Sequence, residues 1–119
     1  MDKVGNTASL LAAGIKAEAL RQRTIADNIA NLETPGYRRG DVKFEELLAK
    51  AMDSHGNVDV TKVEPTVYQP RNTPVKANGN DVNLETEVGE MVKNSLRHKT
   101  FVLLLHKKVK RLDAIIDVP

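Results

Sequence analysis

The chain has 119 residues, a length typical of one domain, and its 40% hydrophobic and 29% charged residues are ordinary for a soluble protein. Its net charge of +2 is too small to indicate nucleic-acid or membrane binding, and the absence of cysteine excludes disulfides, cysteine-ligated zinc and thiol catalysis. Aromatic residues make up only 3%, which favours aliphatic helix seams over a compact layered core.

The N-terminal segment, residues 1–33, is predicted to form a long core helix. Apolar residues recur at alternating spacings of three and four, the pattern of a helix that packs along another helix. A stop follows at Thr34-Pro35-Gly36-Tyr37, because Pro35 disfavours helical geometry before it and Gly36 can take the positive φ of a type II turn. The expected seam is Val4, Ala8, Leu11, Ile15, Glu18, Gln22, Ile25, Ile29 and Leu32.

The middle segment, residues 34–80, differs from both ends of the chain. Apolar residues at helical spacing predict a short helix over residues 44–52. Residues 58–80 are expected to be extended or loop, because Pro65, Pro70 and Pro74 argue against a central strand.

The C-terminal segment, residues 81–119, repeats the heptad pattern and predicts a second core helix over residues 84–116. Asn83 is the expected N-cap, and Glu85 and Glu87 favour the positive end of the helix dipole. The expected seam is Leu84, Val88, Met91, Ser95, His98, Val102, Leu105, Val109, Leu112 and Ile116.

The fold class predicted from these elements is mainly α: an antiparallel coiled-coil hairpin of the two long helices, with an irregular or extended middle segment and one short helix. If Leu32 lies opposite Leu84, the polar interruptions of the two seams coincide, and such a polar layer fixes register. A chance meeting of two mid-seam interruptions is the alternative. The register pairs Ile29 with Val88, Ile25 with Met91, Gln22 with Ser95, Glu18 with His98, Ile15 with Val102, and Leu11 with Leu105.

A further apolar band lies off this seam and makes the second helix apolar nearly all round over about one turn. A two-helix hairpin cannot cover this band. Either the chain's own middle segment covers it, or neighbouring subunits do, in which case its residues are assembly contacts. The band is Leu96, Phe101, Leu103 and Leu104.

Residues typical of catalysis or cofactor binding are not found in a recognisable arrangement. His55, His98 and His106 offer no close metal-ligand pair, and the carboxylate pairs Glu45-Glu46 and Glu85-x-Glu87 are expected on helix surfaces. No nucleotide-binding or nucleophile-elbow motif occurs. We therefore expect no catalytic, cofactor-binding or metal site, and no enzyme.

The sequence shows neither a secretory signal nor a membrane-spanning stretch. Residues 1–7 contain no basic region followed by an apolar core and a cleavage site, so no ordinary secretory signal is expected. The longest apolar stretches, residues 10–15 and 101–105, are too short to span a bilayer, so we expect no direct membrane insertion.

Two motifs carry a resemblance to a known family. Residues 27–39 resemble the N-terminal signature of bacterial flagellar rod and hook proteins, in which an amphipathic helix ends in an Ala-Asn-x-x-Thr-Pro-Gly-Tyr turn. Residues 78–97 resemble the C-terminal signature of the proximal-rod members of that family. The motif positions are Asn28, Asn31, Thr34, Pro35, Gly36 and Tyr37 at the turn, and Gly79, Asn80, Val82 and Leu84 at the start of the second helix.

The resemblance implies a structural subunit of the flagellar proximal rod, which polymerises through its terminal helices and transmits torque from rotor to hook. It also implies export by the flagellar type III apparatus without a cleaved signal peptide, and a place in the rod of the basal body, in the periplasmic space. The implied partners are copies of the chain, other rod proteins and the rotor-ring and export-gate adaptor at the rod base. A helical adaptor or basic nucleic-acid binder unrelated to motility is the alternative.

The asparagines of the turn have a physical role of their own. Their side chains are expected to satisfy backbone groups where the helix gives way to the turn, while Gly36 supplies the backbone geometry. This role is either purely local or part of a contact between subunits.

Overall fold

The computed structural model describes residues 3–116, and the surroundings of side chains 7–114. The elements are α1 (Lys3–Ala30), β1 (Asp41–Lys43), α2 (Glu45–Asp53), a single 3₁₀ turn η1 (Val60–Lys62), β2 (Thr66–Tyr68) and α3 (Leu84–Ile116). The ends of the two predicted core segments, residues 1–2 and 117–119, lie outside this description. So do the side chains of Val4 and Ile116.

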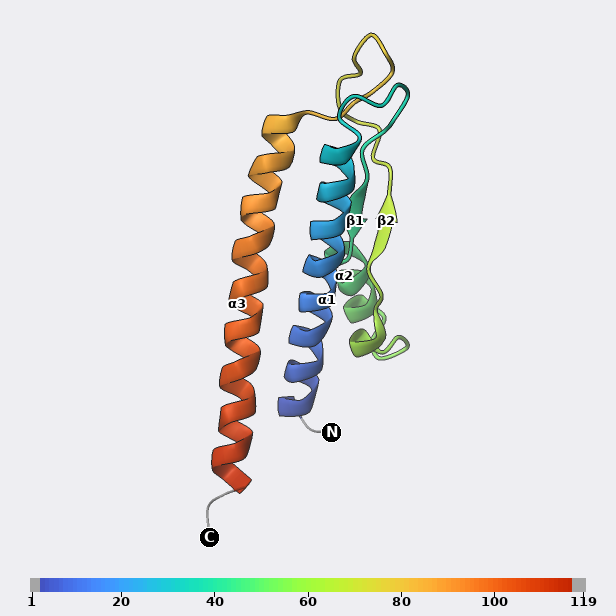
Figure 1. Cartoon of the computed structure of the whole chain (residues 1–119). Helices are drawn as coiled ribbons and strands as arrows, with labels where there is room; N and C mark the ends of the chain where they lie inside the picture. The colour runs from blue at the N-terminus through green and yellow to red at the C-terminus, as the bar shows by residue number, and fades with distance from the viewer. Residues whose placement is uncertain (1–2, 117–119) are drawn as a thin grey trace.

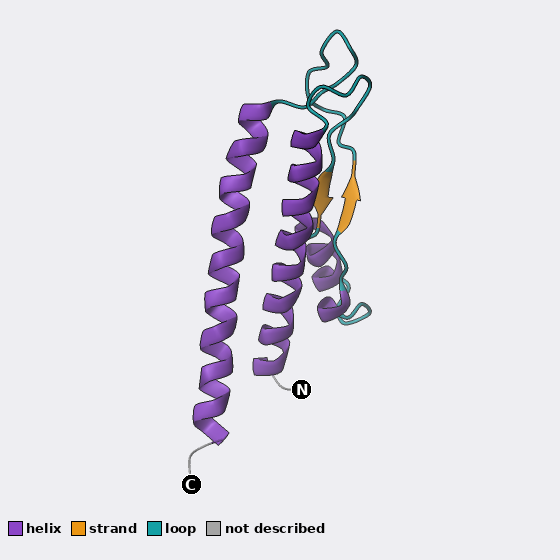
Figure 2. Ribbon diagram, in the orientation of Figure 1, coloured by secondary structure: helices purple, strands orange, loops and turns teal. Residues whose placement is uncertain are grey.

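The molecule is elongated, with principal extents of 68 × 30 × 14 Å. Figure 1 shows α1 between two neighbours: α3 runs antiparallel along one side, and α2 with the strand pair covers the other. The loop between α1 and β1 and the loop between β2 and α3 lie together at one end of the molecule, which we call the elbow (Figures 1 and 2). At the opposite end, α3 continues past the start of α1. The predicted antiparallel helical hairpin is confirmed.

The helix boundaries reflect local chemistry. The last turn of α1 tightens, because the N–H groups of Leu32 and Thr34 donate to carbonyls three residues earlier. The helix therefore ends at Ala30, three residues before the predicted end. At α3, the Asn83 side chain caps the helix by accepting from the Thr86 N–H at 3.0 Å.

The middle segment contains a strand pair that the sequence does not predict. β1 and β2 are antiparallel, with Val42 opposite Val67. Each strand has three residues, too few for a period-two pattern to stand out. Gly40 precedes β1 where a Cβ atom would lie 3.1 Å from Thr24 of α1, so glycine permits the close approach of strand and helix.

The side of α3 that faces α1 differs from the predicted seam. The predicted positions Leu84, Val88, Ser95, Val102 and Val109 are exposed, and so is Gln22 of α1. The buried and half-buried row of α3 is Glu87, Met91, Asn94, His98, Phe101, Leu105 and Leu112. Four of these, Met91, His98, Leu105 and Leu112, belong to the predicted seam.

Polar contacts explain why α3 is rotated about its axis relative to the predicted seam. Glu18 bonds to Asn94 and Arg97 instead of meeting His98, so the axial level of the pairing is kept to within about one helical turn. The apolar pattern of the sequence predicts that the row with Val88 and Val102 faces α1. In the structure the row with Glu87 and Asn94 does so, because these polar side chains have hydrogen-bond partners there. Ile25 of the predicted α1 seam is buried, and Leu11, Ile15 and Ile29 are half-buried.

The expected apolar band is divided as well. Phe101 does not belong to the exposed surface, because its ring lies 3.3 Å from the position of a Cβ atom at Gly14 of α1. Gly14, a weak point for helix propensity, thus makes room for the ring. Leu96, Leu103 and Leu104 are 61%, 56% and 44% exposed.

Candidate functional site

The turn after α1 meets the segment before α3 at the elbow. The Tyr37 N–H donates to the Thr34 carbonyl at 3.2 Å, and Gly36 has φ +75°, as a type II turn requires. The Gly36 N–H also donates to the Asn78 carbonyl at 2.9 Å. The two sequence motifs, about 50 residues apart in the chain, are therefore one structural unit.

Asn80 joins the two motifs through its side chain, which is 0% exposed. Its Nδ2 donates to the carbonyls of Asn31 at 2.8 Å and Thr34 at 2.9 Å, and its Oδ1 accepts from the Val82 N–H at 2.7 Å. The side chain thus gives a second donor to the Asn31 and Thr34 carbonyls, each of which also accepts a backbone N–H within the turn. Asn31 contributes locally, by donating to the Asp27 carbonyl at 2.8 Å.

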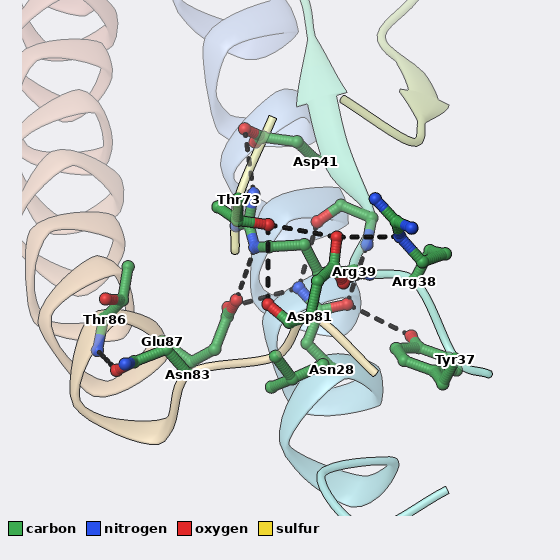
Figure 3. Close-up of polar contacts among 12 residues, drawn as sticks. Asn28, Tyr37, Arg38, Arg39, Asp41, Thr73, Asp81, Asn83, Thr86 and Glu87 are labelled. Carbon is green, nitrogen blue, oxygen red and sulfur yellow. Dashed lines mark hydrogen bonds and ion pairs between the residues drawn. The ribbon is translucent and has the colours of Figure 1, made fainter. Parts of the chain in front are cut away.

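Asn28 holds the incoming chain against α1. Its Oδ1 accepts from the Gly40 N–H at 2.9 Å and the Tyr37 hydroxyl at 3.1 Å, and its Nδ2 donates to the Gly40 carbonyl at 2.9 Å. Nδ2 also lies 3.2 Å from Oε2 of Glu87 on α3. One side chain, 0% exposed, therefore links α1, the turn and α3 (Figure 3).

Two buried carboxylates complete the elbow. Glu87 is 0% exposed and accepts from Arg39 Nε at 2.6 Å. Asp81 accepts from the Arg39 N–H at 2.6 Å, Arg38 Nε at 3.1 Å and the Thr73 hydroxyl at 3.0 Å. Figure 3 shows these side chains converging from α1, α3 and both loops. We call Asn28, Arg38, Arg39, Asn80, Asp81 and Glu87 the elbow cluster.

The pKa values of Asp81 and Arg39 are shifted toward the charged forms of these two residues. Burial alone would raise the pKa of Asp81, but the Arg39 N–H, the Thr73 hydroxyl and the Arg38 guanidinium outweigh it and lower that pKa. Burial opposes the charge of Arg39, while the bond to Glu87 and nearby carboxylates raise its pKa. The pKa of Tyr37 is raised, mainly by burial.

Asp81 makes the free energy of unfolding depend on pH in the acidic range. Its folded-state pKa lies below the ordinary 3.8, so its contribution is complete above that value and is lost as the pH falls through the folded-state pKa. We expect Asp81→Asn to lower the free energy of unfolding at pH 7 by about 2 kcal/mol, and the difference from wild type to shrink at about pH 3. Urea titrations at both pH values measure this difference. A difference that is unchanged at the lower pH would contradict the assignment.

Gly79 is the residue of the elbow most restricted in backbone geometry. It has φ +85°, and a Cβ atom there would lie 3.3 Å from Gly36 Cα. We expect Gly79→Ala to cost about 1–3 kcal/mol of unfolding free energy. Gly89→Ala is the matched control: Gly89 lies in α3 with nothing within 4 Å of a Cβ atom, so alanine is expected to stabilise by about 0.5–1 kcal/mol. Equal effects in denaturant titrations would exclude this explanation.

Several residues of the cluster were not predicted. Arg38, Arg39 and Asp81 were not candidate site residues, and Glu87 was expected on a helix surface, which is wrong because it is fully buried. The signal available in the sequence was the run of two arginines directly after the turn motif. Of the predicted motif residues, Thr34, Pro35, Gly36 and Leu84 are exposed, whereas Val82 is buried at 1% exposure.

The polar groups of the elbow cluster are fully hydrogen-bonded. No buried side-chain nitrogen or oxygen atom among the described residues lacks a hydrogen-bond partner. Within the same part of the chain, no three His, Cys, Asp or Glu residues are grouped so as to hold a metal ion. None of the described helices has the length and apolarity that crossing a bilayer requires.

Comparisons with known proteins agree with the two motifs. A family model described as "Flagella basal body rod protein" matches residues 11–38, which include the end of α1 and the turn. The flagellar basal body rod protein FlgB of Borreliella burgdorferi is 31% identical over 67% of this chain and 73% of its own length. FlgB of Proteus mirabilis is 25% identical over 98% of both chains, and FlgB of Bacillus subtilis is 26% identical over 82% of both. The chain therefore belongs to the family of flagellar basal body rod proteins FlgB.

Proposed function

We propose that the chain is a structural subunit of the proximal rod, which polymerises through its terminal helices and passes torque from rotor to hook. Family membership supports a structural rod component of the flagellar basal body. The observation that carries the finer proposal is the large apolar surface that α3 turns away from its own subunit.

This surface follows one side of α3. At about 100° per residue, seven exposed apolar side chains fall within an arc of roughly 140°. Their exposed fractions range from 42% to 61%. Polar side chains such as Ser95, Lys99 and His106 fall within the same arc, so the apolar residues form a row and not an unbroken patch. A row of exposed apolar side chains along one side of a helix indicates an interaction surface. We call it the outer stripe: Leu84, Val88, Val92, Leu96, Val102, Leu103 and Val109.

The outer stripe suits contact with copies of the same chain. It contains Leu96 and Leu103 of the proposed assembly contacts, whereas Leu104 lies farther round the helix, on the side of Arg97, and Phe101 packs on Gly14. The length of α3 allows contacts with more than one neighbour.

The elbow cluster suits the transmission of torque. A shaft made of helical hairpins needs a fixed angle between the two helices of each hairpin. Asn28 and Asn80 provide this through directional hydrogen bonds to backbone groups of both connecting segments. We propose that the motif residues keep the hairpin rigid from within the subunit.

The remaining details of this function also belong to the proposal. The chain acts as one domain of three segments, 1–33, 34–80 and 81–119, without cofactor or catalysis. Its partners are copies of itself, other rod proteins, the rotor-ring and export-gate adaptor at the rod base, and the type III export apparatus. Its place is the rod, in the periplasmic space, reached without a cleaved signal peptide.

Deletion of the gene in the source organism tests the function. We expect the deletion strain to lose swimming and to lack rods in purified basal bodies, and the wild-type gene in trans to restore both. An epitope-tagged chain should co-purify with basal bodies. A deletion strain that swims normally would exclude the proposal, and tight, steeply salt-dependent DNA binding would favour the alternative function.

A further inference from the structure

The loop that precedes α3 contains the pair Asn78-Gly79, and no other asparagine of the chain is followed by glycine. The peptide nitrogen after an asparagine is able to attack the asparagine side chain. Glycine favours this attack because it has no Cβ atom to obstruct the approach. Asn78 is exposed, so water and base reach it from solvent. Its local sequence therefore makes Asn78 the asparagine of this chain most prone to deamidation.

Deamidation at this pair takes two steps, and water is the one co-reactant. In the first step the Gly79 nitrogen forms a bond to Cγ of Asn78, and the side-chain nitrogen leaves as ammonia, taking up the Gly79 proton through solvent. The product is a five-membered succinimide ring. In the second step water adds to one of the two ring carbonyls and breaks its bond to the nitrogen. Addition at Cγ gives aspartate, whereas addition at the main-chain carbonyl gives isoaspartate, in which the backbone runs through the former side chain.

The folded turn opposes the first step. The Gly79 N–H donates to the Lys76 carbonyl at 2.9 Å, and this bond must break before the nitrogen loses its proton and attacks. Oδ1 of Asn78 accepts from the Asn80 N–H at 3.1 Å, which restrains the side chain. The Lys76 N–H donates to the Asn80 carbonyl at 2.8 Å and closes the turn from the other side. Attack therefore requires the turn to open.

The elbow holds this turn in place on both sides of Gly79. The Asn78 carbonyl accepts from the Gly36 N–H at 2.9 Å. The Asn80 side chain is 0% exposed and bonds to two carbonyls of the turn after α1. Opening of the turn at Gly79 therefore requires contacts between the two sequence motifs to break.

The two products fit the elbow differently. Aspartate at position 78 leaves the backbone unchanged, and its carboxylate still provides an acceptor for the Asn80 N–H. Isoaspartate lengthens the main chain by one carbon atom and displaces the carbonyl that accepts from Gly36. Little room exists for this, because a Cβ atom on Gly79 would already lie 3.3 Å from Gly36 Cα, and Asn80 is fully buried. The elbow should thus accept aspartate and exclude isoaspartate.

We infer that Asn78 is a deamidation site controlled by the elbow. The closed turn protects Asn78, an open turn allows the reaction, and the isoaspartate product prevents the turn from closing again. The modification is therefore a covalent record of turn opening. The inference rests on the chemistry of one residue pair and its contacts, and it does not depend on the proposed function.

Incubation of the purified full-length chain in mildly alkaline buffer tests the protection. Peptide mapping by mass spectrometry measures conversion of residue 78 in the folded chain and in urea above the unfolding transition. In urea, Asn78 should convert faster than Asn72, an exposed asparagine of the same loop that is followed by Thr73. In the folded chain the conversion should be slower by about tenfold or more, because only molecules with an open turn react. Equal rates in the two conditions, or no faster conversion than at Asn72 in urea, would overturn the inference.

Asn80→Ala tests the control by the elbow, because it removes the side chain that anchors the turn and leaves Asn78 and Gly79 unchanged. We expect conversion of residue 78 in the folded variant to accelerate by about threefold or more. Asn57→Ala is the matched control, since Asn57 is exposed in the turn after α2, and it should leave the rate unchanged. Circular dichroism shows whether each variant is folded. An unchanged rate in a folded Asn80→Ala variant would exclude control by the elbow.

The products supply a test that does not require Asn80→Ala to fold. Asn78→Asp represents the aspartate product and should unfold at the same urea concentration as wild type. Chains that have reacted in urea and are then refolded contain isoaspartate, which labelling by an isoaspartate methyltransferase identifies. These chains should unfold at a urea concentration lower by about 0.5–1 M. Equal midpoints for the isoaspartate and aspartate forms would show that the elbow does not exclude isoaspartate.

Discussion

Replacement of Asn28 by alanine is expected to lower the free energy of unfolding by about 3–4 kcal/mol. The side chain is 0% exposed and makes hydrogen bonds to both backbone groups of Gly40, to Tyr37 and to Glu87. Alanine leaves the buried N–H and carbonyl of Gly40 without partners, and it removes a donor from a buried carboxylate. Each loss costs more than an ordinary hydrogen bond contributes, because water does not replace the missing partner.

Urea titrations followed by circular dichroism at 222 nm measure this loss. Asn57→Ala is the matched control: Asn57 is exposed in the turn after α2, and we expect a change within about 0.5 kcal/mol. Asn28→Asp is a second test, because a carboxylate there cannot donate to the Gly40 carbonyl and adds a negative charge beside Glu87. We expect it to destabilise at pH 7 at least as much as alanine. A loss below about 1 kcal/mol for both variants would show that the elbow cluster does not hold the hairpin.

The sequence predicts the elements whose signals are local. The bounds of α3 follow from the Asn83 cap and a long heptad pattern, and the turn after α1 follows from Pro35 and Gly36. The short helix α2 also agrees with the apolar spacing of residues 44–52. These signals depend on residues only a few positions apart, so they can be recognised in a single sequence.

The face that α3 presents to α1 was predicted only in part: Met91, His98 and Leu105 of the seam are half-buried. The buried polar residues of this face were not predicted, because their burial depends on contacts between distant residues. Glu87 is buried because Arg39, 48 positions away, neutralises it, and Asn94 is buried because Glu18, 76 positions away, accepts its hydrogen bonds. A hydrophobicity pattern gives both positions to the solvent side. The predicted seam did identify a real surface: several of its α3 positions belong to the outer stripe, which faces away from α1.

The strand pair and the buried Arg39 escaped prediction for the same reason. β1 becomes a strand because β2, about 25 residues later, pairs with it. Arg39 is 8% exposed, although arginine is seldom fully buried, because Glu87 and Asp41 lie beside its guanidinium. In both cases the long-range partner determines the local structure, and a single sequence does not show which residues become partners.

Substitutions in the outer stripe are expected to have a large effect on rod assembly. Leu96 is its most exposed residue, at 61%. We expect Leu96→Asp to abolish swimming and to remove rods from purified basal bodies, because a carboxylate buried without a partner in an apolar contact between subunits costs several kcal/mol. The isolated subunit should keep its helix content and its free energy of unfolding to within about 0.5 kcal/mol, since residue 96 faces solvent there.

Thr100→Asp separates the stripe from a general effect of charge on α3. Thr100 is exposed one turn further along α3, outside the stripe, and its hydroxyl donates to the Leu96 carbonyl at 2.8 Å. A strain with this variant should swim. Leu103→Asp, on the stripe, should fail to swim like Leu96→Asp. If both stripe variants assemble rods normally, the contact between subunits lies on another face of the hairpin; if Thr100→Asp also blocks assembly, added negative charge rather than loss of the stripe is responsible.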